Sequence, residues 1–322
     1  MAHEITNTNG MDEMAFTGSR AAIWHGLGQE LPVGASIAEW RKAAGMDWEA
    51  MESLVSYNAL GETKFAPDKK LLFRSDNKEA LGIVGSDYKI VQPGQVLGFF
   101  DDLTKLHGMR LSTAGTLFGG KRFWALAETS NKADVVGGDE VGAYLLLTTS
   151  VDGTMSTQAR YTSIRVVCNN TLTIALSGNA KRAVKMTHHR EWDPTQVKID
   201  MGLLGESWAG YLGKLRALSE IKMSEQDTRK FYEKMFYNPS KAEPTTAEQR
   251  TVDMLMEKAF AGIGSEMSAG TAWGALNGAT ELYTHWKGNR DLSRQFWDAF
   301  AGEQSDKKDM VLNGLVEQFE IA

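Results

Sequence analysis

The stretch GAYLLLTTSVDGTMSTQARYTS, residues 142–163, contains two β-rich runs that meet at Asp152-Gly153. A second stretch, RLSTAGTLFGGKRFWALAE at residues 110–128, repeats the pattern around Gly119-Gly120. Both dipeptides are typical of tight hairpin turns, because their residues readily take the positive φ angles that such turns require. The sequence therefore predicts two successive β-hairpins, which together supply four antiparallel strands.

The stretch that follows, IRVVCNNTLTIALSGNAKR at residues 164–182, is predicted to turn into a helix near Asn169 and to stop at Gly178. Such a helix would cross one face of the four strands. Antiparallel β-hairpins packed with a crossing helix define an α+β fold. We assign this core module to residues 53–192.

The residues before the hairpins carry their own helix and strand signals. Residues 1–52 form an irregular N-terminal segment, except that Ser36 and Glu39 make a capping box for a short helix over 36–46. Residues 53–91 predict short strands separated by Asp-Asn and Gly-Ser turns. Pro93 and Gly108 bound a further helix.

Residues 193–322 are predicted to be a mostly helical C-terminal region. Large apolar side chains recur there at alternating spacings of four and three residues, at Val197, Met201, Leu204, Trp208, Tyr211, Leu215 and Leu218. This heptad seam predicts a helix about 30 Å long, which either packs inside one subunit, the commoner case, or joins two subunits. Further helices are expected near 224–236, 246–261, 270–287, 290–302 and 306–320.

The composition is that of an ordinary globular protein, with 42% hydrophobic and 24% charged residues. A single cysteine cannot build an intrachain disulfide framework or a cysteine zinc cluster, which indicates a reducing compartment. The first residues lack the basic and apolar blocks of a signal peptide, and no run approaches the roughly 18 apolar residues of a membrane span. We expect a cytoplasmic protein without a membrane partner.

Three motifs that suggest catalysis fail on inspection. GTLFGGK at residues 115–121 matches the core of a phosphate-binding loop, but Arg122 replaces the required Ser or Thr and a β-type run follows where a helix should begin. The six histidines show no metal-ligand spacing, and the pair His188-His189 is better explained as part of a solvated basic segment. Cys168 has strongly apolar neighbours, so we favour a core cysteine over a nucleophile. We predict no cofactor and no metal.

Anion binding is the chemistry that the residues support best. The net charge of −6 hides a basic region at residues 160–190, which contains six lysines and arginines and no acidic residue. Basic side chains interleaved with aromatic ones suit a single nucleic-acid strand, because cations meet the phosphates while bases stack on the rings. The candidate binding residues are Arg160, Arg165, Lys121, Arg122, Lys181, Arg182, Lys185, Trp124, Tyr161, Asn169 and Asn170. A solvated basic face with core aromatics explains the same pattern equally well.

Four stretches in the same order resemble the phage/plasmid-like protein family, a family of unknown function: IWHGLG (23–28), TAGTLFGGKRFWALAE (113–128), YLLLTTSVDGTMSTQARYTSIRVVCNNTLTIAL (144–176) and GTAWGALNGATELYTHWKGN (270–289). The order of hairpins and helix also resembles, at the level of the fold alone, the single-strand annealing proteins that include phage RecT and Red-beta. In those proteins a sheet and a crossing helix form a basic groove along which oligomers hold a DNA strand.

These resemblances imply a DNA-binding protein that anneals single strands in phage or plasmid recombination, without ATP hydrolysis and inside a bacterial host cell. They also imply a homo-oligomer, as a ring or filament, and a phage exonuclease as a possible partner. Two other classes stay open at this point: a metal-dependent nuclease assembled from distant carboxylates, and a non-enzymatic host-interaction protein that uses the helical region.

Overall fold

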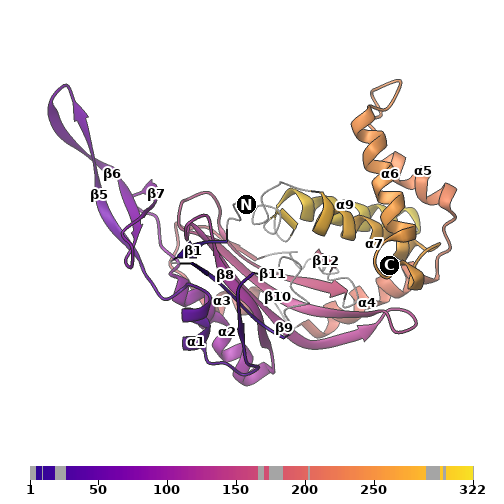
Figure 1. Cartoon of the computed structure of the whole chain (residues 1–322), viewed down its shortest axis with the longest axis horizontal. Coiled ribbons are helices and arrows are strands. Elements are labelled where there is room, and N and C mark those ends of the chain that lie inside the picture. The colour runs from indigo at the N-terminus through magenta and orange to yellow at the C-terminus, as the bar shows by residue number, and fades with distance from the viewer. Residues whose placement is uncertain are drawn as a thin grey trace. The chain divides into compact units, whose positions relative to one another are not determined.

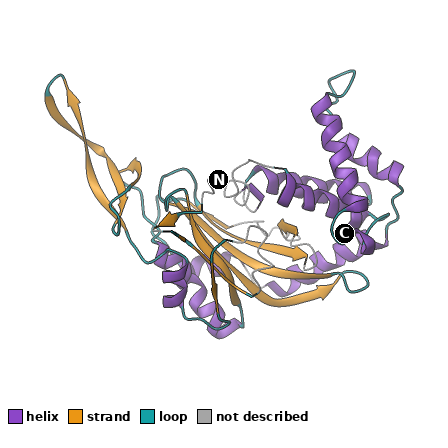
Figure 2. Ribbon diagram, in the orientation of Figure 1, coloured by secondary structure: helices purple, strands orange, loops and turns teal. Residues whose placement is uncertain are grey.

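The computed structural model describes residues 5–8, 10–18, 27–165, 170–173, 184–201, 204–287, 298–299 and 302–321. These residues form two compact units, which are interleaved along the chain. The first unit comprises residues 1–130, 144–161 and 183–202, and the second comprises 131–143, 162–182 and 203–322. Helices and antiparallel strand groups both contribute, so the predicted α+β class is confirmed (Figures 1 and 2).

The largest sheet contains eight of the described strands. Seven follow the order β12-β11-β10-β9-β8-β3-β4, and β13 also pairs with β11. Their bounds are β3 Met14–Thr17, β4 Gln29–Leu31, β8 Arg110–Leu117, β9 Arg122–Asp134, β10 Glu140–Ser150, β11 Thr157–Arg165, β12 Asn170–Thr173 and β13 Val184–Met186. The pairs β8–β9 and β10–β11 are the two hairpins that the Gly-Gly and Asp-Gly signals predicted. Two short strands, β1 Asn7–Thr8 and β2 Met11–Asp12, pair separately.

One prediction about this sheet is wrong. Asn170–Thr173 is strand β12, with Asn170 opposite Arg165 of β11, and is not the start of a helix. Two of these four residues are β-branched threonines, which favour strands. The strand extends the sheet by one more antiparallel neighbour of β11. The remainder of the predicted helix, residues 174–178, lies outside the described residues.

A second, three-stranded sheet has the order β5-β6-β7, formed by β5 Ala50–Ala59, β6 Glu62–Arg74 and β7 Ala80–Gly85. The turn after Arg74 and the one after Gly85 lie where the Asp-Asn and Gly-Ser signals predicted them. Strand β7 pairs only with residues 69–73 of β6, so the distal parts of β5 and β6 continue as a two-stranded ribbon (Figure 1). We call residues 51–70 the β-arm.

Three of the described helices belong to the first unit: α1 Ile37–Ala43, α2 Pro93–His107 and α3 Pro194–Met201. The predicted capping box is present, since the backbone of Glu39 donates to Ser36 Oγ at 3.3 Å and Ser36 N donates to Glu39 Oε2 at 2.7 Å. Helix α2 ends at Gly108, which has φ +65 and so takes the left-handed cap that favours glycine. Both helix predictions are confirmed.

The second unit is mainly helical. Its helices are α4 Leu204–Glu220, α5 Glu225–Phe236, α6 Thr246–Ala261, the short 3-10 helix Ser265–Met267, α7 Ala272–Glu281, the π-helix Leu282–Trp286 and α9 Glu303–Gln318. Trp208, Tyr211, Leu215 and Leu218 of the heptad seam are all buried. The seam in α4 therefore packs within the subunit, which is the first of the two interpretations offered by the sequence. Among the described residues, no helix is both long and apolar enough to cross a membrane.

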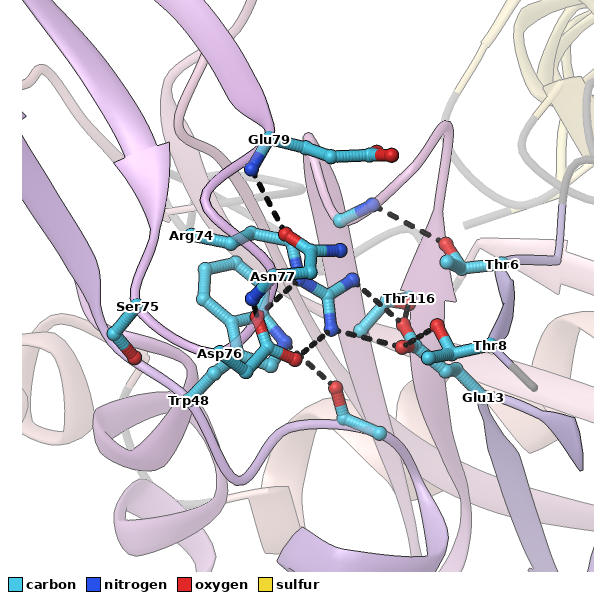
Figure 3. Close-up of polar contacts among 12 residues, drawn as sticks. Thr6, Thr8, Glu13, Trp48, Arg74, Ser75, Asp76, Asn77, Glu79 and Thr116 are labelled. Carbon is cyan, nitrogen blue, oxygen red and sulfur yellow. Dashed lines mark hydrogen bonds and ion pairs between the residues drawn. The ribbon is translucent and has the colours of Figure 1, made fainter.

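A buried ion-pair cluster fixes the N-terminal strands in the first unit (Figure 3). Arg74 donates from Nη2 to Glu13 Oε1 at 2.8 Å and from Nη1 to Glu13 Oε2 at 3.1 Å, and both side chains are buried. Asp76 accepts from Arg74 Nη2 at 2.7 Å. Burial alone would lower the pKa of Arg74, but hydrogen bonds and charge from Asp76 and Glu13 outweigh it and raise that pKa. Arg74 therefore stays charged.

The same cluster positions the turn between β8 and β9. Thr116 Oγ1 donates to Glu13, and Gly120 N donates to Thr6 Oγ1 at 3.2 Å. Gly120 has φ +88, and a Cβ atom there would lie 3.0 Å from Arg74 Nη1. Only glycine satisfies both the positive φ and the close approach of the guanidinium. The ion pair and the glycine together hold the Gly-Gly turn in one place.

Candidate nucleic-acid interface

The turn from β8 to β9 presents an aromatic ring and two cations. Phe118, Gly119 and Gly120 follow one another with positive φ angles of 57, 70 and 88 degrees. A left-handed backbone is ordinary for glycine but costs a bulky residue such as phenylalanine roughly 1–2 kcal/mol. Strained residues of this kind cluster at functional sites. Phe118 is half-buried, as are the neighbouring cations Lys121 and Arg122.

Arg122 links this turn to the neighbouring hairpin. Its guanidinium carbon lies 5.1 Å from the centroid of the Phe118 ring, within the range of a cation–π interaction. Its Nη2 donates to Thr154 Oγ1 at 3.1 Å. The backbone joins the same two turns, because Val151 N donates to the carbonyl of Lys121 at 2.8 Å. The ring, the two cations and the β10–β11 turn therefore form one local structure.

The β10–β11 turn, residues 151–156, is tightly organised by its own polar groups. Asp152 Oδ1 accepts from the backbone N of Thr154 at 3.0 Å and from its hydroxyl at 2.5 Å. Gly153 has φ +77, as the Asp-Gly signal predicted. Ser150 Oγ donates to the carbonyl of Met155 at 3.1 Å across the base of the turn. Asp152 is the one carboxylate of this turn, and Thr154 donates two hydrogen bonds to it. The same Thr154 hydroxyl accepts from Arg122.

A basic segment, residues 184–190, runs beside the same hairpin. Strand β13 pairs with β11 in a register that places Lys185 opposite Gln158, and the Lys185 side chain is exposed. Beyond β13 the segment is anchored by His188, whose ring stacks on Tyr88 with centroids 4.4 Å apart. Nδ1 of His188 lies 2.9 Å from the carbonyl of Lys89. His188 is therefore buried and not solvated as the sequence suggested, while His189 and Arg190 are exposed.

Burial changes the roles of three predicted binding residues in β9 and β11. Trp124 is 2% exposed and its Nε1 donates to Thr113 Oγ1 at 3.3 Å, while Tyr161 is 6% exposed and burial raises the pKa of its hydroxyl to about 12. Neither ring has a face open to a base, so the predicted stacking role does not fit these residues. Arg160 is 9% exposed and donates from Nη2 to Gln158 Oε1 at 2.8 Å, so little of its side chain is accessible to a phosphate.

The other predicted residues give less information. Asn169, Lys181 and Arg182 lie outside the described residues, as does Cys168. Arg165 and Asn170 face each other across β11 and β12 in the second unit, and only their backbones are described. Of the predicted set, Lys121 and Arg122 lie on the β9 side of the β10–β11 hairpin, and Lys185 of β13 lies on its β11 side.

Sequence reasoning missed Phe118, although a signal was present. An apolar aromatic residue directly before Gly-Gly in a predicted hairpin turn has no strand face on which to be buried. Such a residue is exposed at least in part, so the stacking role predicted for Trp124 and Tyr161 fits Phe118 better. Phe123 and Trp124 alternate within β9 and are both buried.

Two other features of the described residues bear on the choice of site. A groove of about 680 Å³ between α5 and α9 is lined by Asp306, Asp309 and Glu317, with Lys234 as the basic residue of its lining. An excess of carboxylates repels phosphate, so this groove is a poor place for nucleic acid. Within the described ranges, no group of three or more His, Cys, Asp or Glu side chains is placed to hold a metal ion.

The comparisons with known proteins define the class of the chain but no activity. Residues 80–302 match the family model described as a domain of unknown function, DUF932. This match covers more than half of the sequence, and the chain belongs to that family. The search of curated proteins and the search of solved structures returned no significant match.

Proposed function

We propose that the chain binds single-stranded DNA at the hairpin surface formed by Phe118, Lys121, Arg122 and Lys185, and that it anneals complementary strands in phage or plasmid recombination without ATP. The observation that carries this proposal is the Phe118–Arg122 pair beside Lys121. One partly exposed ring for a base and adjacent cations for phosphates are the two elements of a single-strand binding surface.

The rigidity of the surface supports the same proposal. Gly120 is locked against Arg74, the β10–β11 turn is closed by Asp152 and Thr154, and His188 holds the basic segment against Tyr88. A preorganised surface loses little conformational entropy when a ligand binds. Annealing requires that bases stay accessible while phosphates are held, and phosphate contacts do not read the sequence.

The direct test mixes a fluorescently labelled single-stranded oligonucleotide with the full chain. The buffer contains a metal chelator and no ATP, because the proposed activity needs neither metal nor ATP. We expect binding by anisotropy and faster pairing of two complementary oligonucleotides. Absence of binding at micromolar protein would overturn the proposal. Shortening of the labelled strand on addition of magnesium or manganese would favour the nuclease alternative. The predicted exonuclease partner belongs to this proposal and is tested separately, by co-purification with a candidate exonuclease. The bacterial cytoplasm is the setting that the proposal expects, and fractionation of the host cell tests it.

A further inference from the structure

The β-arm exposes apolar side chains that a folded monomer ordinarily covers. Leu54 is 75% exposed, Tyr57 is 56% exposed and Phe65 on the facing strand is 61% exposed. The arm has only two strands beyond the end of β7, and an isolated two-stranded ribbon is marginally stable in water. The exposed side chains and the thin architecture both indicate a surface that is covered in the working protein.

The two edges of the arm differ in how they are protected. The β6 edge carries Pro67 within an irregular stretch between Phe65 and Lys70, a feature that blocks pairing with another strand. The β5 edge contains no proline, and Glu52 is its one charged residue between Met51 and Ala59. At its base Gln92 caps the edge, donating from Nε2 to the Ala50 carbonyl at 3.1 Å and accepting from Ala50 N at 2.8 Å.

Beyond that cap, the outer edge of β5 pairs with no other strand within the described part of the chain, because the sheet order is β5-β6-β7. An unprotected apolar edge is a template for an added strand. We propose that this edge pairs with the same edge of a second copy of the chain, so that two β-arms form one continuous antiparallel sheet across a two-fold axis.

Charge decides between a second copy and nucleic acid as the occupant. Residues 51–70 contain three acidic and three basic side chains, so the β-arm has no net charge to attract a polyanion. Glu52 and Lys70 already pair at 2.6 Å, as do Glu62 and Lys64. Because the surface is neutral overall and the β5 edge carries one charge, two copies of this edge do not repel each other strongly. Two-fold symmetry pairs the two β5 strands in antiparallel fashion.

The symmetry of the surface also suits this occupant. A two-fold contact uses the same patch of both copies, so one free β5 edge supplies both halves of the interface. Pairing of β5 with β5 closes with two copies, whereas the seam in α4 is buried and is not a subunit contact.

The test compares the mass in solution of three forms of the full chain by light scattering at micromolar concentration. The wild type is expected at twice 35.5 kDa. The double variant Leu54→Lys with Tyr57→Lys places charges beside the edge and is expected at 35.5 kDa. The matched control Phe65→Lys changes an equally exposed apolar residue on β6 and is expected to remain a dimer.

A second variant, in which residues 56–65 are replaced by an Asn-Gly turn, shortens the arm without touching the rest of the first unit. It is expected to be monomeric and to melt at the temperature of the double variant. A monomeric wild type, or a double variant that remains dimeric, would overturn the proposal. A monomeric wild type whose oligonucleotide affinity falls in the double variant would assign the β-arm to nucleic acid instead, and would also overturn it.

Discussion

The guanidinium of Arg122 lies over the ring of Phe118, with the guanidinium carbon 5.1 Å from the ring centroid. Phe118 adopts a left-handed backbone with φ 57, which is unfavourable for its side chain. The pair therefore combines backbone strain with a partly exposed cation and ring. Because the surrounding contacts sustain this strain at a surface turn, we place Phe118 at the centre of the proposed binding surface.

Replacing Phe118 separates binding from stability. Phe118→Ala and Phe118→Gly both remove the ring, so each should weaken oligonucleotide binding by about 1–3 kcal/mol. Only glycine relieves the left-handed backbone, so the glycine variant should be more stable than the alanine variant by about 1 kcal/mol. Urea unfolding and anisotropy titration measure the two quantities. Equal binding by the wild type and both variants would remove Phe118 from the site.

Trp124 should behave as a core residue and not as a stacking residue. Trp124→Ala is expected to lower the free energy of unfolding by about 3–5 kcal/mol, because it leaves a cavity beside Gly115. Oligonucleotide affinity, measured at a temperature where the variant is folded, should change little. A variant that melts like the wild type but no longer binds would show that the burial of Trp124 has been misinterpreted.

The Glu13–Arg74 pair should dominate the stability of the N-terminal strands. Arg74→Met leaves the Glu13 carboxylate buried without its partner and should cost about 3–5 kcal/mol of unfolding free energy. Adding Glu13→Gln to that variant should recover part of the loss. The control is Arg229→Met in the exposed pair with Asp253 at 2.9 Å, for which about 0–1 kcal/mol is expected. Equal losses at the two sites would contradict this account.

His188 should make stability depend on pH. Burial lowers its pKa below the ordinary value of 6.5, so the unfolded chain binds a proton at a higher pH than the folded protein does. The contribution of His188 is therefore fully present above pH 6.5 and is lost as the pH falls through that value toward the lowered pKa. Melting temperatures of the wild type should fall over this window.

The matched control for that experiment is the neighbouring histidine. His189 is exposed, so His189→Gln should retain the pH dependence, whereas His188→Gln should melt lower at neutral pH and show a flatter profile. A His188→Gln profile parallel to that of the wild type would assign the pH dependence to other groups.

Much of the fold followed from local sequence signals. The Gly119-Gly120 and Asp152-Gly153 dipeptides specified both hairpins, because few residues other than glycine take the required φ angles cheaply. The capping box located α1, and Pro93 and Gly108 located α2, since the residues that suit a helix terminus are a strictly local feature. These elements are encoded by residues a few positions apart.

What escaped prediction depends on distant neighbours. Asn170–Thr173 pairs with β11, which is a tertiary contact that leaves no local signal in the sequence. The prediction of a helix there is wrong for that reason. Arg74 showed no sign of burial in the sequence, since its partner Glu13 is 61 positions away. For the same reason the predicted binding set mixes two kinds of residue: Lys121, Arg122 and Lys185 are at least partly exposed, whereas Trp124 and Tyr161 are buried, because packing decides the exposure of aromatic rings. That the three cations bind nucleic acid stays a prediction. The boundaries of the three predicted domains stay a prediction.

The central claim is tested most directly by the salt dependence of oligonucleotide binding. Lys121→Ala with Arg122→Ala removes two phosphate contacts, so the slope of log affinity against log salt should fall by about 1.4, at about 0.7 for each contact on a single strand. The matched control, Arg229→Ala with Lys230→Ala, removes the same charges from α5 and should keep the wild-type slope. A reduced slope in the first variant alone is the predicted result. An unchanged slope in a folded Lys121→Ala, Arg122→Ala variant would contradict the proposed interface.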